Sequence, residues 1–572
     1  MPIHNSDVET IFNRVADLLE IEGANQFRVR AYRNAARIVG GFSRNVADMV
    51  EQAEDLTELS GIGEDLAGKI EEIVRTGGLE QLEEIERRTP PGLAELLKVS
   101  GLGPKRVQVL REELGITSLD ELERAAKEGQ IRQIRGFGEK IETGILKDLK
   151  RVREDEGRTL LMVAEQVAEP LVDYLREAEG TSQVAVAGSY RRRKETVGDL
   201  DILVTRDDGA GAIERFVQYE DVAEVVSKGE TRSTVMLRSG LQVDLRVVTS
   251  ESYGAALLYF TGSKPHNIHL RRLAMDRGLK INEYGVFEGQ DRIAGGREEE
   301  IYALFDLSLI PPELREDRGE IEVAQNDALP ELVTLDDIRG DLQMHTKSSD
   351  GHATLEEMAR MAQSLGYEYI AITDHSAYVA VTQGLDVEAL AQQIDDIDRL
   401  NEELEGIVLL KSIEVDILED GSLDLPDDSL KRLDLTICSV HSKFDLSRAD
   451  QTERIIRAMD NPYFTILAHP TGRRIDERAP YDVDIERVME AALERGCFLE
   501  INAYPDRLDL NDVHAKMAKD VGIKLAISTD AHRVDELNYM RYGVGQARRG
   551  WLEARDVLNT QPLSDLRSLL ER

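Results

Sequence analysis

Cysteine and long apolar runs are both scarce in this chain of 572 residues. The two cysteines, Cys438 and Cys497, provide neither a disulfide framework nor a thiolate zinc site, which is typical of proteins from a reducing cytosol. No signal-peptide pattern precedes Val8, and no apolar run reaches the length of a membrane span. We therefore expect a cytoplasmic protein without a membrane segment. The length exceeds what one hydrophobic core can organise, so several domains are expected.

Positive charge is also in deficit. The chain has 71 Lys and Arg against 110 Asp and Glu, a formal net charge of −39, which argues against a nucleic-acid partner. Basic clusters nevertheless occur within residues 28–37 and at residues 191–194. Because local side chains make the contacts with phosphate, the overall charge does not exclude DNA.

Two carboxylates stand at the start of an apolar run near residue 200. Asp199 and Asp201 are separated by one residue, and side chains on a strand alternate between faces, so the two point the same way. Like charges at that spacing are costly unless a cation lies between them. A third carboxylate, Asp244, lies inside another strand-like run. Three carboxylates on neighbouring strands could hold two Mg²⁺ ions for in-line phosphoryl transfer.

The residues before this pair are suited to binding phosphate. Gly188 lets the backbone approach a phosphate closely, while Ser189 and Arg192 offer a hydroxyl and a guanidinium. An Asp-x-Asp pattern alone is more often a solvated strand start. The preceding Gly-Ser pair and the third aspartate make a nucleotidyltransferase site the better interpretation.

Three segments in the first 150 residues repeat a Gly-apolar-Gly pattern between helical stretches. The glycines permit a tight turn, and the amides of that turn and of the next helix can hold a phosphate oxygen without contacting bases. One copy is more often an ordinary helix connection, but three copies in one frame are similar to helix-hairpin-helix motifs. The glycines are Gly61 and Gly63, Gly101 and Gly103, and Gly136 and Gly138, and the middle pair is followed by Lys105 and Arg106.

Beyond residue 336, apolar runs alternate with helical patterns. This rhythm predicts parallel strands crossed by helices, and the number of runs suits an α/β barrel. The runs lie at residues 369–372, 407–410, 435–437, 464–467, 498–501 and 524–527. Each ends at or near a residue that can bind metal, and such barrels collect their active-site residues at the C-terminal strand ends.

Most of the ten histidines lie in this half of the chain. A lone histidine after a strand is usually structural, but several on one rim with intervening carboxylates predict a metal site. A mixed ligand set of His, Asp and Glu without Cys suits Zn²⁺ or Mn²⁺ in a hydrolytic site. The residues at these run ends are Asp374, His375, Glu414, His441, His469, Glu500, Asp530 and His532.

With these motifs the chain resembles the X family of DNA polymerases, which includes polymerase beta, in the bacterial and archaeal form that carries a C-terminal PHP phosphoesterase domain. The similarity covers nearly the whole chain. It implies a multidomain fold of helical helix-hairpin-helix domains, an α+β nucleotidyltransferase palm and thumb, and a C-terminal α/β PHP barrel that is a distorted relative of the TIM barrel. The implied domains are an N-terminal helical DNA-binding domain (1–90), a fingers-like helical domain (91–150), a palm (151–251), a thumb-like nucleotide pocket (252–318), a linker (319–336) and a PHP phosphoesterase (337–572).

The resemblance assigns roles in the polymerase half. Asp199, Asp201 and Asp244 are implied as catalytic ligands of Mg²⁺, with Asp244 helping to activate the primer 3′-hydroxyl. The implied nucleotide contacts are Arg158, Gly188, Ser189 and Arg192 at the triphosphate, Tyr259, Phe260 and Gly262 at the sugar, and Asn267 and Arg271 at the minor groove of the new pair. Animal members have an arginine two residues before the third aspartate, where this chain has Gln242.

A lysine on the second helix of the first hairpin is a Schiff-base nucleophile in some family members. Lys69 falls at that position. A desolvated lysine near other cations can be nucleophilic, and a lysine that only binds phosphate is the alternative.

The resemblance also implies a cluster of three metals in the PHP domain. Its ligands would be His345, Asp350, His375, Glu414, His441, His469, Asp530 and His532. The opening motif of the PHP family is His-x-His, and its first histidine is Gln343 here. A glutamine carbonyl is a weaker ligand than imidazole for transition metals, so one of the three metal positions is in question.

We therefore expect a monomeric DNA-directed DNA polymerase that fills short gaps in DNA repair, such as base excision repair. Its PHP domain is expected to act as a 3′-to-5′ exonuclease and abasic-site endonuclease. The expected partners are gapped or nicked DNA and deoxynucleoside triphosphates, with Mg²⁺ in the polymerase site and Mn²⁺ or Zn²⁺ in the PHP site. A nucleotidyltransferase acting on RNA would leave the hairpins unexplained. A DNA-end-binding polymerase whose PHP domain is a degenerate scaffold is the other alternative, which Gln343 allows.

Overall fold

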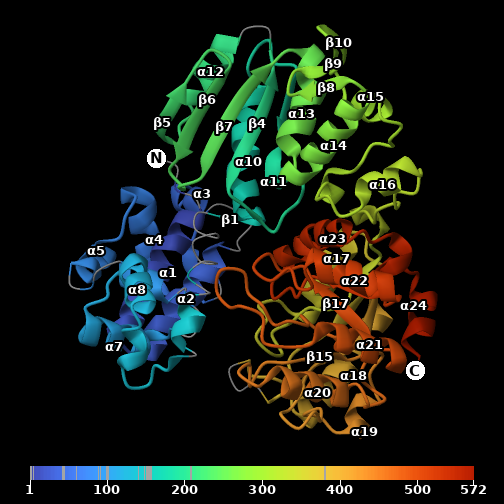
Figure 1. Cartoon of the computed structure of the whole chain (residues 1–572). Coiled ribbons are helices and arrows are strands. Elements are labelled where there is room, and N and C mark those ends of the chain that lie inside the picture. Colours follow the sequence, from blue (N-terminus) through green and yellow to red (C-terminus); the bar gives the residue numbers. More distant parts are fainter. Residues whose placement is uncertain are drawn as a thin grey trace.

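Three parts of the chain separate in Figure 1: blue N-terminal helices, a green sheet with its helices, and an orange-to-red C-terminal half. The computed structural model describes residues 3, 5–40, 46–59, 61–87, 89, 92–97, 99, 102–139, 141–146, 149, 158–206, 209–378 and 382–571. Among these residues, no helix is both long and apolar enough to cross the hydrocarbon core of a membrane.

The N-terminal part consists of helices that each bury one apolar stripe. In α4 (Glu64–Thr76), Leu66, Ile70 and Ile73 recur every three or four positions, which places them on one face. Two apolar clusters result, one mainly among α1 to α5 and the other mainly among α6 to α8. The other helices are α1 (Asn5–Ile21), α2 (Gln26–Gly40), α3 (Val46–Glu51), α5 (Glu80–Glu86), α6 (Gly92–Leu96), α7 (Pro104–Leu114) and α8 (Leu119–Lys127).

The middle part is built on a five-stranded sheet of order β2-β4-β7-β6-β5, in which β4 and β7 run parallel. Leu200, Ile202 and Val204 of β4 pack in the core formed with α10 and α12, so the residues between them face the other side of the sheet. This alternation places Asp199 and Asp201 away from that core. The elements are α10 (Leu161–Arg176), β2 (Gln183–Val186), β4 (Asp199–Thr205), α12 (Gly209–Val217), β5 (Val222–Lys228), β6 (Arg232–Leu237) and β7 (Gln242–Val248).

A smaller unit follows, with four described α-helices and a three-stranded sheet of order β10-β9-β8. Its core extends into residues 319–336, which the sequence predicts to be a linker: the segment contains α16 (Glu320–Gln325), with Ile321 and Ala324 buried. The buried carboxylate of Glu320 lies 2.6 Å from His266 Nδ1. Because this buried contact is polar, the apolar pattern of the sequence did not indicate that the segment packs in a core. The other elements are α13 (Tyr253–Thr261), α14 (Lys264–Asp276), β8 (Leu279–Asn282), β9 (Gly285–Glu288), β10 (Asp291–Ala294) and α15 (Glu298–Ala303).

The C-terminal half contains the predicted parallel strands, crossed by helices. They form a three-stranded sheet, β11-β12-β13, and a five-stranded sheet, β14-β15-β16-β17-β18. Parallel bridges between Met344 and Ala531 and between His375 and Glu414 join the ends of the two sheets. A single closed barrel sheet therefore remains a prediction. The strands are β11 (Gly340–Asp341), β12 (Tyr369–Ile372), β13 (Val408–Lys411), β14 (Glu414–Asp416), β15 (Ile437–Ser439), β16 (Ile466–Leu467), β17 (Phe498–Asn502) and β18 (Leu525–Ser528).

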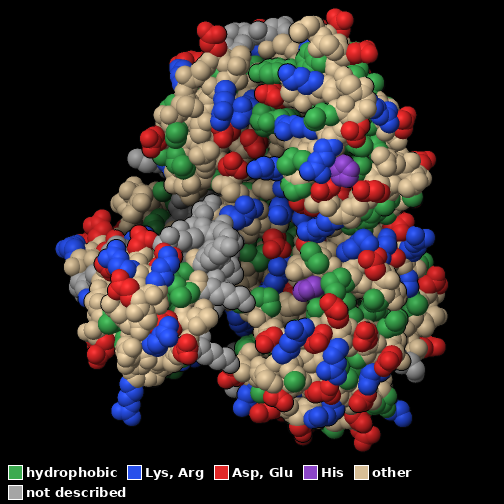
Figure 2. Space-filling model, in the orientation of Figure 1, with side chains coloured by type: hydrophobic (Ala, Val, Ile, Leu, Met, Phe, Trp, Pro, Cys, Tyr) green, Lys and Arg blue, Asp and Glu red, His purple; other side chains and the backbone are tan. Residues whose placement is uncertain are grey.

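Helices surround these sheets and also contact the middle part. Acidic and basic side chains are interspersed on the face shown in Figure 2. The apolar core of the middle sheet includes four residues from the C-terminal half, namely Tyr504, Leu508, Tyr539 and Tyr542. The two parts therefore share a core. The helices of the C-terminal half include α17 (Leu355–Ser364), α18 (Val387–Glu403), α20 (Arg448–Ala458), α21 (Ile485–Arg495), α22 (Asp512–Val521) and α23 (Met540–Arg549).

Candidate active sites in the palm and in the C-terminal half

Three aspartates lie on two adjacent parallel strands of the middle sheet. Asp201 of β4 is directly opposite Asp244 of β7, and Asp199 is opposite Gln242. Gly188 approaches the same carboxylates: its φ is +63°, and a Cβ there would lie 3.1 Å from Asp201 Oδ2. A side chain at position 188 would therefore be both strained and crowded. The structure brings Gly188 and the three predicted carboxylates together.

The three carboxylates repel one another electrostatically. Burial, reinforced by Asp199 and Asp244, raises the pKa of Asp201 to about 7. Burial and Asp244 also raise the pKa of Asp199. A bound divalent cation would reverse both shifts, and an all-carboxylate set suits Mg²⁺. The residues therefore fit the predicted metal.

Asp244 is held by neighbouring polar groups. Thr234 Oγ1 donates to its Oδ1 at 2.5 Å, and Gln242 Nε2 donates to its Oδ2 at 3.1 Å. Arg232 Nη2 lies 3.3 Å from Oδ1. The glutamine that replaces the arginine of animal relatives thus contacts the third carboxylate itself. These bonds fix the orientation of Asp244.

The predicted triphosphate contacts lie on the loop after Gly188. Ser189 is in the short helix α11 (Gly188–Arg191), and Arg192 follows it. Arg192 Nε donates to Glu316 Oε1 at 3.1 Å, and its Nη1 donates to the carbonyl of Thr261. Arg158 Nε donates to Thr196 Oγ1 at 2.9 Å. Both guanidiniums are therefore oriented by protein contacts.

The predicted nucleotide pocket lies at the end of α13. The rings of Tyr259 and Phe260 meet edge to face at 5.0 Å, and Gly262 ends the helix with a φ of +67°. Asn267 Nδ2 donates to the carbonyl of Tyr259 at 2.7 Å, and the Arg271 guanidinium lies 5.1 Å from the Tyr259 ring. These residues lie together as predicted. Three of them, Tyr259, Asn267 and Arg271, line a small depression with Ala255, Leu258, Leu270, Ile281 and Asn282.

The described parts of the hairpins have the predicted turns. Gly61 has a φ of +89°, and Gly63 directly precedes α4. Gly136 has a φ of +93° two residues before Gly138, and Gly103 directly precedes α7. The guanidinium of Arg106 lies 5.9 Å from the Phe137 ring, which links the second and third turns. Gly101 and the side chain of Lys105 lie outside the described residues.

Lys69 is on α4, as the sequence predicts for a second hairpin helix. Its ammonium pairs with Asp65 one helical turn away and lies 5.6 Å from the Tyr32 ring. This ion pair occupies the amine, which a Schiff-base nucleophile needs free.

The histidines and carboxylates of the C-terminal half converge at the strand ends. Among the described residues, groups whose ligand atoms all lie within 4.8 Å of one another occur only here, and the palm aspartates form no such group. The three groups are His345, Asp350, His375 and His532; His375, Glu414 and His441; and His345, Glu414 and Asp530. Seven of the eight predicted ligands therefore fall in these groups.

Glu414 is the centre of this cluster. Its Oε1 lies 3.3 Å from His441 Nε2 and 3.2 Å from His469 Nε2, so the eighth predicted ligand also reaches it. Its Oε2 lies 3.3 Å from His345 Nε2 and 3.4 Å from His375 Nδ1. The Glu414 carboxylate thus connects the three ligand groups.

Two imidazoles of the cluster have pKa values shifted in opposite directions. Burial lowers the pKa of His375 to about 3. Burial would also lower the pKa of His345, but Asp530 and Glu414 outweigh it and raise that pKa to about 10. A metal replaces such protons, since it needs neutral imidazole and ionised carboxylate ligands. Buried His375 Nδ1 has no hydrogen-bond partner among the described residues, so the site fits divalent cations.

Gln343 lies on the same rim and is fully buried. Neither its Oε1 nor its Nε2 has a hydrogen-bond partner among the described residues. A buried amide without hydrogen-bond partners lowers the stability of the fold by about 1–3 kcal/mol. This burial is therefore favourable only when a ligand binds the amide. The amide oxygen is therefore free to act as a ligand for a cation.

Two other candidates at the strand ends have different contacts. Asp374 lies in none of the three groups and accepts hydrogen bonds from Thr346, Ser349 and Gln393, so it holds the loop after His345. Glu500 accepts from the main-chain N–H of His469 at 2.7 Å. Burial raises the pKa of Glu500 well above its usual value, and Asp530 adds to the shift.

Sequence analysis missed one basic residue at this site, Arg507. Arg507 Nε lies 3.7 Å from Asp530 Oδ2, and the side chain is 14% exposed. Arg507 follows β17 by five residues, so its place after a strand end was the only available signal. A guanidinium beside a metal cluster can contact a phosphate ester.

Comparison with known proteins places recognised domains along the chain. The matching family models are a helix-hairpin-helix domain (residues 3–79), a SAM-like helix-hairpin-helix tandem (93–151), the DNA polymerase beta palm (163–273), the DNA polymerase beta thumb (256–316) and the PHP domain (341–503). Together they include the palm aspartates and most of the metal cluster.

Similarity to one curated relative extends over the full length. The chain is 39% identical over 574 residues to the DNA polymerase/3′-5′ exonuclease PolX of Bacillus subtilis, covering 100% of both proteins. It is 38% identical over 206 residues to a probable phosphatase of Thermoanaerobacter, covering 34% of this chain and 78% of the relative. It is 28% identical over 319 residues to DNA polymerase lambda of Arabidopsis thaliana, covering 52% and 57%.

Proposed function

This chain belongs to the X family of DNA polymerases, in the form with a C-terminal PHP domain, and from that premise we propose that it fills short gaps during DNA repair and trims 3′ ends. Its two activities are DNA-directed DNA polymerisation and 3′-to-5′ exonuclease action, as in the full-length relative. The proposal of gap filling in base excision repair is supported by the two helix-hairpin-helix domains, whose turns could hold the DNA backbone.

The palm supplies the groups for nucleotide addition. Asp199, Asp201 and Asp244 would hold Mg²⁺, which when bound supplies positive charge to the reacting phosphates. Asp244, held by Thr234 and Gln242, is placed to help take the proton of the primer 3′-hydroxyl. Positioning and charge, not covalent chemistry, carry this class of reaction.

The nucleotide would bind along the loop after Gly188 and the end of α13. Gly188, Ser189, Arg192 and Arg158 would contact the triphosphate. Tyr259, Phe260 and Gly262 would lie against the sugar, and Asn267 and Arg271 would contact the minor groove of the new pair. The prior orientation of Arg192 by Glu316 supports this role, because preorganised donors bind phosphate at lower entropic cost.

The C-terminal cluster supplies the groups for phosphodiester hydrolysis. Its proposed ligands are His345, Asp350, His375, Glu414, His441, His469, Asp530 and His532, with Mn²⁺ or Zn²⁺ as the ions. Such ions, when bound, activate water and polarise the phosphate. Action on abasic sites is a further proposal for the same cluster. A degenerate scaffold is the alternative, since the amide of Gln343 stands where the family has an imidazole.

DNA and deoxynucleoside triphosphates are the partners of this enzyme class. We further propose a cytoplasmic monomer with domain boundaries near residues 90, 150, 251 and 336. The separate apolar clusters around α1 to α5 and α6 to α8 support the first boundary, and the cluster of α13 to α16, which crosses residue 318, supports assigning residues 319–336 to the thumb-like unit.

The single observation that carries the polymerase proposal is the pairing of Asp201 with Asp244 on parallel strands beside Gly188. One gapped DNA substrate tests both activities. With end-labelled primer, extension is expected only with nucleotides and Mg²⁺, and shortening is expected with Mn²⁺ alone. Asp201→Asn should remove the first and His375→Ala the second. Loss of both activities in either variant would contradict two separate sites.

A further inference from the structure

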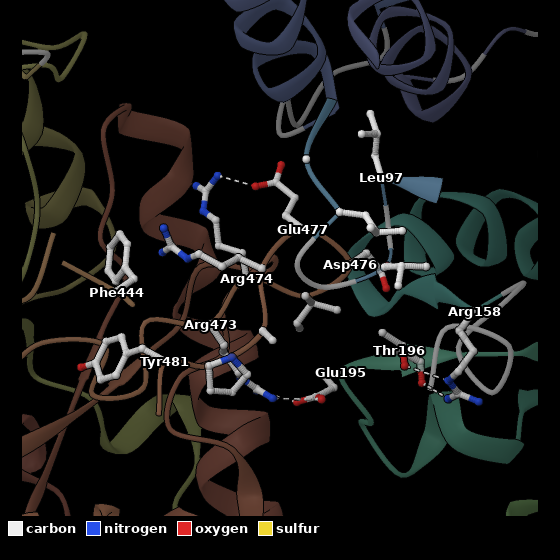
Figure 3. Close-up of a pocket in the computed structure, with 17 residues that line it drawn as sticks. Leu97, Arg158, Glu195, Thr196, Phe444, Arg473, Arg474, Asp476, Glu477 and Tyr481 are labelled. Carbon is white, nitrogen blue, oxygen red and sulfur yellow. Dashed lines mark hydrogen bonds and ion pairs between the residues drawn. The ribbon is translucent and has the colours of Figure 1, made fainter. Parts of the chain in front are cut away.

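A cavity of about 530 Å³ lies where the three parts of the chain meet. Figure 3 shows its walls: Leu97 from the N-terminal helices, Arg158 and Thr196 from the palm, and a loop of the C-terminal half, residues 473–481. Val99, Leu102 and Gly103 of the middle hairpin also line it. The cavity therefore adjoins both the turn of the middle hairpin, which is predicted to hold a phosphate, and the palm.

Four arginines line this cavity and differ in how they are paired. Arg473 binds Glu195 at 2.6 Å, and Arg474 binds Glu477 at 3.0 Å, as the dashed lines in Figure 3 show. Arg158 donates to Thr196, a neutral partner. The fourth, Arg478, donates its Nε to the carbonyl of Gly472 at 2.9 Å and forms no ion pair with a described carboxylate.

Arg478 therefore has no direct ion pair with a described carboxylate, and the nearby charge of Glu477 offsets only part of its own. Burial, with Arg507 and Arg474 nearby, lowers its pKa to about 10. Its guanidinium remains charged at neutral pH because that pKa is still well above 7. An entering anion would relieve the repulsion among these cations. Phosphate is the anion that a guanidinium binds with two parallel hydrogen bonds.

Aromatic rings stand beside this cation. The rings of Phe444 and Tyr481 are nearly parallel, at 17°, with centroids 6.1 Å apart. The Arg478 guanidinium lies 4.3 Å from the Phe444 centroid. Phe444 is half-buried, so part of its surface remains accessible. Aromatic faces beside cations are the combination that binds single-stranded nucleic acid, through base stacking and phosphate contacts.

The loop that lines the cavity leads directly to the metal cluster. It begins a few residues after His469, whose Nε2 contacts Glu414. Arg507 is close enough to Arg478 to lower its pKa, and Arg507 Nε lies 3.7 Å from Asp530 Oδ2. Cationic groups thus continue from the cavity wall to a carboxylate of the cluster.

We propose that this cavity binds the single-stranded 3′ end of DNA and guides it from the palm to the metal cluster, with Arg478 contacting a phosphate and Phe444 stacking on a base. This inference rests on the proposed exonuclease function, because it needs a hydrolytic site at the end of the path. Arg507 is the inner contact, placed to meet the phosphate at the cluster.

The test compares a DNA substrate with one too small to use the cavity. Arg478→Met keeps an aliphatic chain against Phe444 but removes the charge, and Phe444→Ala removes the stacking face. Each should raise the KM for a labelled single-stranded oligonucleotide on the order of tenfold, because Arg478→Met loses a phosphate contact and Phe444→Ala loses a base-stacking contact. Arg478→Met should also lower the slope of log affinity against log salt by about 0.7.

Four controls separate this proposal from its alternatives. Hydrolysis of the p-nitrophenyl ester of thymidine 5′-monophosphate should be unchanged in both variants, as should primer extension. Phe444→Trp should keep the wild-type KM for DNA. Arg487→Met removes an arginine that pairs with Glu453 on the surface of the same half, away from the cavity, and should behave as wild type. Unchanged KM for DNA in both cavity variants would overturn the proposal. Wild-type protein that hydrolyses neither substrate would instead overturn the exonuclease function.

Discussion

Arg549 of helix α23 donates a hydrogen bond from Nη1 to the main-chain carbonyl of Arg192 at 2.8 Å. The same nitrogen lies 3.1 Å from Glu316 Oε1, the carboxylate oxygen that also accepts from Arg192 Nε. Arg549 Nη2 is fixed by Asp512 Oδ2 at 2.6 Å. A buried arginine of the PHP half thus orients the proposed triphosphate contact of the palm.

Arg549→Met should therefore impair nucleotide binding by the palm. The KM for deoxynucleoside triphosphates is expected to rise about tenfold, with a smaller change in kcat, because Arg192 loses its fixed orientation. Arg549→Lys should recover part of the loss. Steady-state extension of a gapped primer measures both constants.

The neighbouring residue provides a matched control for this prediction. Arg548 pairs with Glu313 at 2.7 Å and donates to the carbonyl of Val333, so it also crosses between parts but does not touch Arg192. Arg548→Met should leave the nucleotide KM unchanged. Equal effects in the two variants would mean that α23 supports the interface in general and not Arg192 in particular.

Asp244→Ala should abolish nucleotide addition while leaving DNA binding and 3′-end degradation nearly unchanged. The substitution removes a proposed metal ligand and touches neither the hairpins nor the C-terminal cluster. Extension and degradation of one labelled primer, with binding measured by gel shift, are the readouts. Normal extension would rule out the palm assignment.

The sequence predicted the palm carboxylates because their geometry is local. Alternation along β4 sets Asp199 and Asp201 on one face, and Leu200 between them reaches the core on the other. The bond from Arg549 to Arg192 was beyond sequence reasoning, since 357 residues separate the partners and neither belongs to a repeated pattern. Arg507 was missed for the same reason, because only the folded strand ends bring it to Asp530.

Glu298 should stabilise the thumb-like unit through two arginines. Burial would raise its pKa, but Arg315 and Arg191 outweigh burial and lower it to about 2. A depressed carboxyl pKa contributes stability that is present above its unfolded value near 4.5 and is lost as the pH falls toward 2.

Glu298→Gln should accordingly cost about 3–5 kcal/mol at neutral pH, because it leaves the fully buried Arg315 without its anion. The difference in thermal stability between wild type and variant should shrink below pH 4.5, because the carboxyl of the unfolded chain then takes up a proton while the folded one stays ionised down to about pH 2. Unfolding followed by calorimetry from pH 7 to pH 3 measures this. A difference that stays constant over that range would show that Glu298 contributes by packing alone.

Lys69 is predicted to form an imine with a 5′-deoxyribose phosphate. Borohydride should trap the protein on such DNA, and Lys69→Ala should lose the adduct. Asp65→Asn should increase the yield, because it releases the amine from its ion pair with Asp65. Equal trapping of wild type and Lys69→Ala would place the nucleophile elsewhere or make the adduct nonspecific.

We predict that Gln343 determines how tightly the C-terminal cluster holds one of its metals. Its amide is fully buried with both polar atoms unpaired, while the imidazoles and carboxylates around Glu414 are all present. We predict 3′-to-5′ degradation that is strongest with Mn²⁺, unaffected by Asp244→Ala and lost in His375→Ala or Asp530→Ala. Gln343→His should lower the Mn²⁺ concentration for half-maximal activity by about 10–100-fold, since loss of a metal-supporting contact costs about that much.

The measurement is release of end-labelled nucleotide across a Mn²⁺ titration with Asp244→Ala protein, so that polymerisation does not compete. Gln343→Leu is the matched control: it keeps the size of the side chain and removes the amide oxygen, so it should need more Mn²⁺ than wild type if that oxygen is a ligand. Equal titration curves for Gln343→Leu and wild type would show that the amide does not bind metal. No release by wild type at any Mn²⁺ concentration, with release restored by Gln343→His, would make the natural domain a scaffold. Release that survives His375→Ala would come from a contaminating nuclease, because that substitution removes a ligand shared by two of the three groups.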